Sequence, residues 1–261
     1  MSTWILLRGL TRERRHWGEF PDLMAAAFPE SKVLALELPG NGERLAEASP
    51  WRISGMMAQV RRELDDRGLK PPFMLLAMSM GAMVATTWAT EHPDDIKGCV
   101  LINTSFGRFS PLHQRLRPRA WWKLLMAGMS GSPHQREQRI WELTTRLVPE
   151  SSGIVDQWAA IRTTRPVSLG NALRQLVAAA GFRAPAVAPA PTLLLVGAAD
   201  GLVHPKCSLT IAQAWQCGLA IHPEAGHDLP LDDGPWVVER VREWLMNGQE
   251  SQALPAPDAE T

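Results

Sequence analysis

Short apolar runs alternate with longer amphipathic segments along most of this 261-residue chain. The runs are largely apolar on both faces, which suits strands that helices cover from each side. Strands that alternate with helices of this length predict βαβ units, and so an α/β fold with a mostly parallel sheet. The predicted strands are residues 4–7, 33–38, 73–78, 100–103, 192–197 and 219–222, and the predicted helices are residues 17–28, 53–67, 80–92, 205–216 and 236–246.

The alternation stops between residues 103 and 191. This stretch has helical patterning and scattered tryptophans, without a convincing strand. We therefore expect residues 105–184 to form a helical cap inserted over the carboxyl edge of the sheet, and a separate small helical domain is the alternative. A proline-rich segment, residues 184–191, would lead the chain back to the sheet.

This interruption sets the predicted domain organisation. Residues 1–104 and 185–246 would form the α/β core around the sheet, and residues 105–184 would form the insertion. Residues 247–261 are polar and acidic and contain prolines, so we expect a disordered tail there.

The composition excludes several classes of protein. Lys and Arg (27) balance Asp and Glu (27), so no overall positive charge indicates nucleic-acid binding. Cys99, Cys207 and Cys217 are too irregularly spaced for a disulfide framework or a zinc site, which favours a reducing compartment. The N-terminus lacks the pattern of a signal peptide, and no apolar run is long enough to span a membrane. We expect a cytoplasmic protein with no membrane and no nucleic-acid partner.

A serine between a predicted strand and a predicted helix is the strongest sign of chemistry. Ser79 is the centre of the sequence Ala-Met-Ser-Met-Gly at residues 77–81. Small residues two positions before and after the serine let the strand and the helix meet in a tight turn that exposes the hydroxyl. An ordinary helix-capping serine is the alternative.

A nucleophilic serine needs a base, and the base needs a carboxylate that orients it. Asp200 follows the fifth predicted strand, and His227 follows the last one. The chain order Ser79, Asp200, His227 is the order expected on this architecture. As alternatives, Asp200 caps the next helix, His227 is a surface-loop residue, or His222 is the base. Asp228 is adjacent to His227 and is not the expected orienting acid.

Attack by serine also needs N–H groups that stabilise the developing negative charge on oxygen. Met80 follows the serine at the start of the predicted helix, where its N–H faces that charge. Gly9 follows the first predicted strand and would let the loop turn back, so that the Leu10 N–H converges with that of Met80. A plain glycine turn is the alternative.

Together these features resemble the α/β-hydrolase fold superfamily over about residues 4–245. The serine turn, a Pro-Gly-Asn-Gly loop at residues 39–42 and the segments around Asp200 and His227 carry the resemblance. Among the members, the chain is similar to compact cytoplasmic serine esterases, including the pimeloyl-[acyl-carrier protein] methyl ester esterase group. It is also similar to the plant methylesterase and hydroxynitrile lyase group.

The resemblance implies a catalytic triad in which Ser79 attacks a carbonyl, His227 relays the proton and Asp200 steadies the histidine. Leu10 and Met80 would form the oxyanion hole. The implied reaction is hydrolysis of a carboxylic ester or thioester through an acyl-serine, and it needs no metal and no organic cofactor. The alternatives are a lyase that uses the same triad for proton transfer, as in hydroxynitrile lyases or menaquinone-pathway relatives, and a non-enzymatic ligand receptor.

The chain departs from the family pattern at two positions. Ala77 replaces the usual glycine two residues before the serine, where one methyl group can be tolerated. Arg8 replaces the usual histidine before the oxyanion-loop glycine, which puts a candidate anion receptor beside the pocket. Arg8 is therefore a candidate substrate-binding residue, together with Trp121 and Trp122 of the insertion.

The overall neutrality hides a segregation of charge. Residues 105–184 carry eleven arginines and Lys123 against four acidic residues, a net charge of +8, and Arg115, Arg117 and Arg119 cluster near their start. A basic cap would steer an acidic partner toward the pocket. We therefore expect the acyl group to arrive on an acidic acyl carrier protein or on coenzyme A, or to bear a carboxylate itself. A solvated arginine-rich surface is the alternative.

Overall fold

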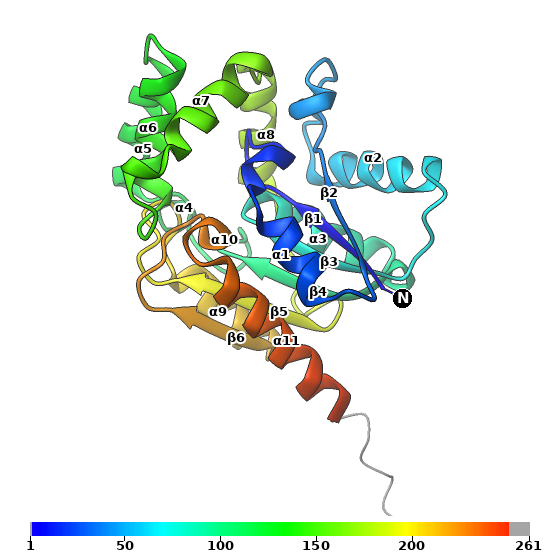
Figure 1. Cartoon of the computed structure of the whole chain (residues 1–261). Helices are drawn as coiled ribbons and strands as arrows, with labels where there is room; N and C mark the ends of the chain where they lie inside the picture. The colour runs from blue at the N-terminus through cyan, green and yellow to red at the C-terminus, as the bar shows by residue number, and fades with distance from the viewer. Residues whose placement is uncertain (1, 251–261) are drawn as a thin grey trace, which may run out of the picture.

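Six parallel strands form the centre of the molecule (Figure 1). The structure is a computed structural model that describes residues 2–250. Every neighbouring pair of strands is parallel, so the predicted α/β fold is confirmed. The strands lie in the order β2-β1-β3-β4-β5-β6, with bounds β1 (Thr3–Leu7), β2 (Lys32–Leu36), β3 (Phe73–Met78), β4 (Ile96–Ile102), β5 (Thr192–Gly197) and β6 (Gly218–His222).

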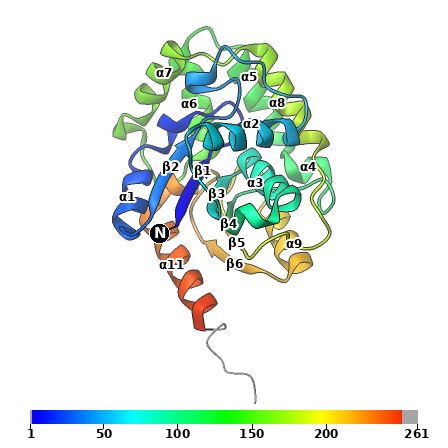
Figure 2. The same cartoon turned by 90° about the vertical axis from the view of Figure 1, so that its right-hand side faces the viewer.

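Helices cover both faces of the sheet (Figure 2). Helices α2, α3 and α9 pack on one face, and α1 and α11 pack on the other. Within residues 2–250, no helix is both long and apolar enough to cross a membrane. The helices outside the insertion are η1 (Arg14–Trp17), α1 (Phe20–Ala27), η2 (Gly42–Arg44), α2 (Ile53–Asp66), α3 (Met80–Glu91), η3 (Pro93–Asp95), α9 (Lys206–Trp215), α10 (Leu229–Asp232) and α11 (Gly234–Glu250).

Side chains of each strand alternate between two apolar layers. In β1, Ile5 and Leu7 belong to the cluster with α2, α3 and α9, whereas Trp4 and Leu6 belong to the cluster with α1 and α11. All four are at most 1% exposed. Because both faces of each central strand are buried, its sequence reads as an uninterrupted apolar run.

Strand β4 begins at Ile96, earlier than the predicted start at Val100. An exposed lysine, Lys97, and a glycine, Gly98, interrupt the apolar pattern there. A Cβ atom at Gly98 would lie 2.9 Å from the Trp244 ring. The glycine therefore belongs to the strand, because it makes room for a side chain of α11.

Two predicted helix boundaries also differ from the structure. Gly18 has a φ of +55°, a left-handed conformation that ends η1, so α1 begins only at Phe20. At the other end, α11 continues to Glu250, within the predicted disordered tail. The remainder of that predicted tail, residues 251–261, lies outside the described residues.

The regular structure between β4 and β5 is helical. Figure 1 shows these helices gathered over the sheet, at the edge where the strands finish. Ile154, Val155, Trp158 and Ile161 give the insertion a small apolar cluster of its own. The helices of the insertion are α4 (Leu112–Arg115), α5 (Pro118–Gly128), α6 (Pro133–Thr144), η4 (Glu150–Ser152), α7 (Ile154–Thr164) and α8 (Leu169–Gly181).

Arginines of the insertion bind carbonyl oxygens at the ends of its helices. Arg115 donates to Ala179 O (2.6 Å) and Ala180 O (3.0 Å) in the last turn of α8. Arg136 donates to Ala127 O (2.9 Å) in the last turn of α5. The last carbonyls of a helix lack partners within it, and a cation there also opposes the negative end of the helix dipole. Part of the positive charge of the insertion therefore holds its helices in place.

Candidate active site

The strand order opens a crevice beside the end of β1. Strands β2 and β3 lie on opposite sides of β1, and the chain leaves β1 and β3 toward opposite faces of the sheet. Ligands of open parallel sheets bind at such a point, at the carboxyl ends of the strands. The loop after β1 and the turn after β3 both line a cavity there. These are the predicted oxyanion loop and the predicted nucleophile turn.

Ser79 joins β3 to α3 in a strained turn. Its backbone has φ +55° and ψ −117°, a conformation that costs a residue with a side chain about 1–3 kcal/mol. Its N–H donates to Ile102 O at 2.9 Å, which holds the turn against the end of β4. The residue is partly exposed and lines the cavity, so the turn presents its hydroxyl to a ligand.

Two glycines let the chain approach this turn closely. A Cβ atom at Gly81 would lie 2.5 Å from Leu7 O, so the start of α3 packs against the end of β1 only with glycine there. A Cβ atom at Gly9 would lie 3.1 Å from the Cβ atom of Ser79. Ala77, before the serine, is fully buried among core side chains, which accommodates the methyl group that departs from the family pattern.

Asp200 and His227 form a buried pair. His227 Nδ1 lies 2.7 Å from Asp200 Oδ2, and the two residues are 3% and 1% exposed. The other carboxylate oxygen, Oδ1, accepts the N–H groups of Leu202 (2.7 Å) and Val203 (2.9 Å). The fixed carboxylate orients the imidazole, and this leaves Nε2 as the ring nitrogen for proton transfer.

Asn103, which was not predicted as part of the site, joins the loops of the acid and the base. Its Nδ2 donates to Gly226 O (3.0 Å) and His227 O (2.8 Å), and its Oδ1 accepts the Gly197 N–H (2.9 Å). It is 2% exposed, with a φ of +46°. Asparagine adopts this left-handed conformation more readily than most residues, so an asparagine that ends a buried strand is the sequence signal for such a role.

His222, the alternative base, is engaged elsewhere. Its Nε2 lies 3.2 Å from Asp233 Oδ2, and its Nδ1 accepts the Ala225 N–H at 3.0 Å. It belongs to β6 and does not line the cavity. This position leaves His227 as the histidine that can serve Ser79.

A cavity of about 180 Å³ brings the predicted site residues together. Ser79, His227, Leu10 and Met80 line it, and Asp200 lies behind His227. Most of the wall consists of Met, Leu and Val side chains of the core and Leu, Ile and Ala side chains of the insertion. Such a wall has room and apolar surface for a hydrocarbon group beside the serine.

Trp121 and Trp122, the predicted substrate-binding residues of the insertion, do not line this cavity. They are 47% and 66% exposed on α5. The inward face of α5 carries Ala120, Leu124 and Ala127, at spacings of three and four residues, so the two tryptophans point away from it. The sequence pattern predicts the helix but not which of its faces meets the cavity.

A family model described as Hydrolase_4, serine aminopeptidase, S33, matches residues 53–234, well over half of the chain. The chain belongs to this family. The predicted resemblance to α/β-hydrolases is thereby confirmed, and the protein is a hydrolase of that fold.

Relatives of this hydrolase include esterases. The pimeloyl-[acyl-carrier protein] methyl ester esterase of Neisseria meningitidis is 27% identical over 199 residues, which cover 73% of this chain and 75% of that protein. The biotin biosynthesis bifunctional protein BioHC of Teredinibacter turnerae is 29% identical over 108 residues, which cover 40% of this chain but only 17% of that longer protein. A solved structure of a thermophilic esterase from Thermogutta terrifontis has a TM-score of 0.73 at 20% identity, covering 95% of this chain and 90% of that one. That structure shares the fold.

Arg8 of the hydrolase is neutralised by the neighbour of the predicted base. Its Nη1 and Nη2 donate to Asp228 Oδ1 (2.9 Å) and Oδ2 (2.6 Å), and both side chains are 3% exposed. The guanidinium also lies 4.8 Å from the centre of the Trp17 ring. Arg8 lines the cavity, but it is not the free anion receptor that the sequence predicted, because a carboxylate already occupies it. The pair instead ties the oxyanion loop to the loop of His227.

The far end of the oxyanion loop is anchored to the insertion. Arg12 Nη1 donates to Glu137 Oε2 of α6 (2.7 Å), and Arg162 of α7 binds the other oxygen. Burial alone would raise the pKa of the Glu137 carboxyl, but attraction to Arg12 and Arg162 outweighs it and lowers that pKa. The fully buried, ionised Glu137 therefore bridges this loop and two helices of the insertion.

A third anchor holds the middle of the loop. Thr11, with a φ of +54°, donates its N–H to Gln175 Oε1 of α8 at 2.8 Å. Gln175 Nε2 donates to Asn41 Oδ1 (2.8 Å), and Asn41 Nδ2 donates to Arg12 O (3.0 Å). Leu10, the predicted oxyanion donor, thus lies in a loop that side chains hold on both sides. These anchors were not predicted, because single polar residues on a helix are usually exposed.

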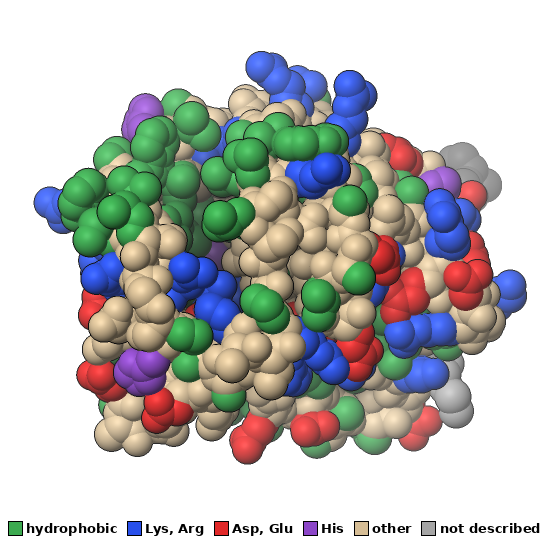
Figure 3. Space-filling view, turned by 90° about the horizontal axis from the view of Figure 1, so that it is seen from above, with side chains coloured by type: hydrophobic (Ala, Val, Ile, Leu, Met, Phe, Trp, Pro, Cys, Tyr) green, Lys and Arg blue, Asp and Glu red, His purple; other side chains and the backbone are tan. Residues whose placement is uncertain are grey.

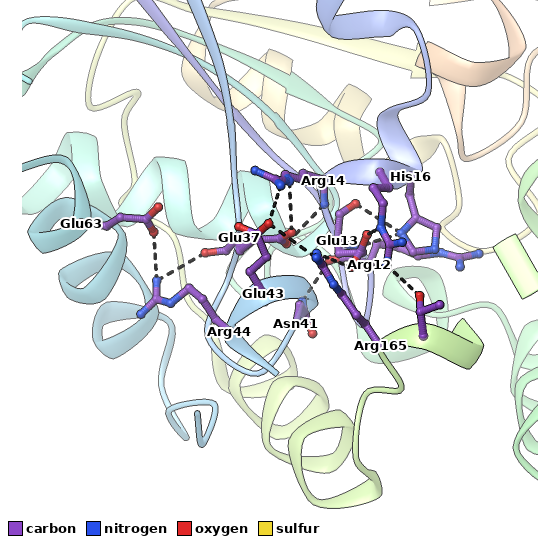
Figure 4. Close-up of polar contacts among 12 residues, drawn as sticks. Arg12, Glu13, Arg14, His16, Glu37, Asn41, Glu43, Arg44, Glu63 and Arg165 are labelled. Atoms are coloured by element: carbon purple, nitrogen blue, oxygen red, sulfur yellow. Dashed lines mark hydrogen bonds and ion pairs between the residues drawn. The ribbon is translucent and has the colours of Figure 1, made fainter. Parts of the chain in front are cut away.

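Glu37 lies in a cluster of carboxylates and arginines behind this loop (Figure 4). Its side chain is 5% exposed, and burial, followed by repulsion from Glu13, raises the pKa of its carboxyl to about 7. Its Oε2 accepts the Arg14 N–H at 3.2 Å, whereas its Oε1 has no hydrogen-bond partner in the described part of the chain. Glu37 therefore changes charge near neutral pH, outside the cavity lining.

Proposed function

We propose that the hydrolase cleaves carboxylic esters or thioesters through an acyl-serine intermediate. The observation that carries this proposal is the buried Asp200–His227 pair, 2.7 Å apart, at a cavity where a strained turn exposes Ser79. The apolar wall of that cavity supports an acyl group with a hydrocarbon body as the substrate.

In the proposed reaction, His227 Nε2 takes the proton of Ser79 as the serine oxygen bonds to the acyl carbon. The N–H groups of Leu10 and Met80 stabilise the negative carbonyl oxygen, and Asp200 stabilises the imidazolium. Collapse of this intermediate breaks the bond to the alcohol or thiol, which leaves with the proton from His227. Water then attacks the acyl-serine by the same route and releases the carboxylic acid.

A fluorophosphonate probe tests the nucleophile directly. We expect the probe to label the wild-type protein and not Ser79→Ala, and we expect p-nitrophenyl ester hydrolysis to fall by at least about 10⁴-fold in that variant. Ser208→Ala is a matched control, since Ser208 is a buried serine that donates to Thr104 O. Equal labelling of wild type and Ser79→Ala would contradict the proposal.

The same variants separate the alternatives. A lyase of this fold would need Ser79 but would release no carboxylic acid from esters or thioesters. A ligand receptor would bind an acyl compound without turnover. A panel of esters by chain length, alongside an ester carried on acyl carrier protein, shows which leaving group is accepted.

An acidic carrier of the acyl group is part of this proposal. The name of the Neisseria relative refers to an ester on acyl carrier protein, and the insertion of this chain is basic. Arg115 and Arg117 are not available for such a partner, because Arg115 binds the end of α8 and Arg117 donates to Asp200 O at 2.6 Å. Steering would therefore depend on the net charge of the insertion and on exposed arginines such as Arg119 and Arg183.

Charge reversal at the exposed arginines tests the carrier. We expect Arg119→Glu with Arg183→Glu to lower kcat/KM about tenfold for a carrier-bound ester at low salt and to leave a small neutral ester unaffected. The measurement is steady-state turnover of both substrates. Equal losses for both substrates, or none, would remove the carrier from the proposal.

A further inference from the structure

The outer face of the insertion exposes large apolar side chains. Figure 3 looks down on this face and shows hydrophobic side chains in two groups with a hollow between them. Large exposed patches of apolar side chains on a globular protein usually mark a site that binds another molecule or a membrane. We call the following residues the apolar rim, each at least 45% exposed: Leu112 on α4, Trp121, Trp122 and Leu125 on α5, Met129 directly after α5, and Leu169, Leu173, Leu176 and Val177 on α8.

The rim does not result from loosely packed helices. Helix α8 buries Asn171 and Gln175, and both are hydrogen-bonded to the core. Its leucines at 169 and 173 face solvent instead, 81% and 54% exposed. A helix that serves only to fold turns its leucines inward and its amides outward. The exposed leucines therefore point to a binding role for this face.

The rim is continuous with the cavity. Leu112 and Leu176 belong to the rim and also line the cavity. Leu124 of α5 and Ala180 of α8 line the same cavity as Ser79. A hydrocarbon chain can thus pass from the outer face to the serine along apolar side chains.

The rim also lies on the basic part of the molecule, because the insertion has a net charge of +8. Arg119 is exposed on α5 near Trp121 and Trp122, and Lys123 of the same helix pairs with Glu142 at 3.5 Å. Tryptophan, leucine and basic residues together are the composition that binds the interface of an anionic lipid layer. We propose that the rim docks the hydrolase on a lipid surface with anionic headgroups, which revises the expectation from the sequence that the protein has no membrane partner. This inference rests on the proposed ester or thioester hydrolysis, and it adds to the carrier-bound substrates a second class, acyl esters that reside in such a surface.

Two other occupants fit the rim less well. A second copy of this chain on the rim would cover Leu112 and Leu176 and so close the cavity. An acidic carrier protein would bind exposed arginines such as Arg119 and Arg183, and neither belongs to the apolar rim. A lipid surface needs neither a permanent contact nor paired charges, and a peripheral contact needs no membrane-spanning helix.

Vesicle binding tests the docking independently of catalysis. The probes are vesicles of phosphatidylglycerol mixed with phosphatidylcholine, and vesicles of phosphatidylcholine alone, in a co-sedimentation assay. We expect wild type and Ser79→Ala to bind the anionic vesicles equally, and Leu125→Gln with Met129→Gln and Leu173→Gln to bind at least about tenfold more weakly. These three residues do not line the cavity, so hydrolysis of a soluble short-chain ester should persist in the triple variant.

A control variant has comparable exposure elsewhere. Val187→Gln with Met246→Gln changes residues that are 69% and 65% exposed and lie outside the rim, and it should bind vesicles like wild type. Absence of vesicle binding by wild type, or equal binding by the triple variant, overturns the docking. A stable dimer in solution that only the triple variant breaks, without vesicle binding, assigns the rim to a second copy and also overturns it. If wild type binds the anionic vesicles but neither it nor any variant hydrolyses esters, the proposed function is overturned and the docking remains.

Discussion

The sheet and the insertion of this hydrolase are held by different forces. The strands are fixed by apolar layers on both faces and by parallel backbone pairing. The insertion has a small apolar cluster and is held mainly by charged and amide side chains, such as Glu137 between two arginines and Arg115 on the end of α8. Ser79, Asp200 and His227 therefore stand on the region with large apolar layers, while part of the cavity wall around them stands on the insertion, whose own apolar cluster is small.

The largest expected effect separates chemistry from stability in the region around the sheet. Asp200→Asn keeps an oxygen that can accept the N–H groups of Leu202 and Val203, but its amide would favour the wrong tautomer of His227. We expect kcat to fall by about 10³–10⁴-fold with little change in Tm. Steady-state ester hydrolysis and thermal unfolding of the same variant give kcat and Tm. A Tm that falls in step with kcat would show that the acid acts mainly on the fold.

Removing one charge should loosen the insertion and leave the sheet intact. Glu137→Gln leaves Arg12 and Arg162 buried without their carboxylate, and breaking a buried pair in this way costs about 3–5 kcal/mol. Hydrogen exchange should therefore rise in α6 and α7 and remain slow in β3 and β4. Glu142→Gln is the matched control on α6, since its exposed pairing with Lys123 at 3.5 Å should contribute under about 1 kcal/mol. Equal exchange in the two variants would contradict the assigned anchor.

The free energy of unfolding should depend on pH through Glu37, which lies in the ion-pair cluster behind the loop after β1. Glu37 has a pKa of about 7 in the folded chain against an ordinary value of 4.5, so the native state binds more protons between these values. The free energy of unfolding therefore falls as the pH rises from 4.5 to about 7, and is constant above that for this group. Glu37→Gln should remove that slope. The free energy of unfolding of this variant should exceed that of wild type by up to about 3 kcal/mol at pH 8. Chemical denaturation across this range measures it.

Glu43→Gln is the control for this measurement. Glu43 is in the same cluster (Figure 4), but its side chain is 47% exposed. Its replacement should leave the slope between pH 4.5 and 7 in place. The assignment to Glu37 is wrong if Glu43→Gln flattens the curve as much as Glu37→Gln.

The smallest expected effect concerns the oxyanion loop itself. Thr11 has a β-branched side chain at φ +54°, where glycine is favoured. Thr11→Gly relieves this strain and adds freedom to the unfolded chain, so we expect a net gain of under about 1 kcal/mol and a rise in Tm of up to about 3 °C. Calorimetry of the two proteins measures it. A lower Tm would indicate that the threonine side chain holds the loop together.

The sequence predicted the sheet because burial on both faces leaves a local mark. Each strand of the sheet lies close to a predicted one. The prediction for β4 starts too late because Lys97 and Gly98 interrupt the apolar pattern. The serine turn also has a local signature, since Gly81 is demanded by the close approach of Leu7 O. The fold and the family followed from such features.

The anchors of the site were not predictable in this way. Arg8 and Asp228 are 220 positions apart, and Arg12 and Glu137 are 125 apart, so no local pattern marks either pair. Periodicity predicted helices in the insertion but left open the faces they turn to the cavity. Trp121 and Trp122 are therefore predicted to bind substrate, whereas both are exposed to solvent on α5.

The pairing of Arg8 with Asp228 constrains how this enzyme can diverge. A neutral residue at either position alone leaves the remaining charge buried without a partner, which costs about 3–5 kcal/mol, a large share of the stability of a typical domain. A return to the histidine common in the superfamily at position 8 would thus require a simultaneous change at position 228. Homologues that keep an arginine at position 8 should retain an acidic residue at position 228, directly after His227. Positions 8 and 228 should therefore covary among homologues.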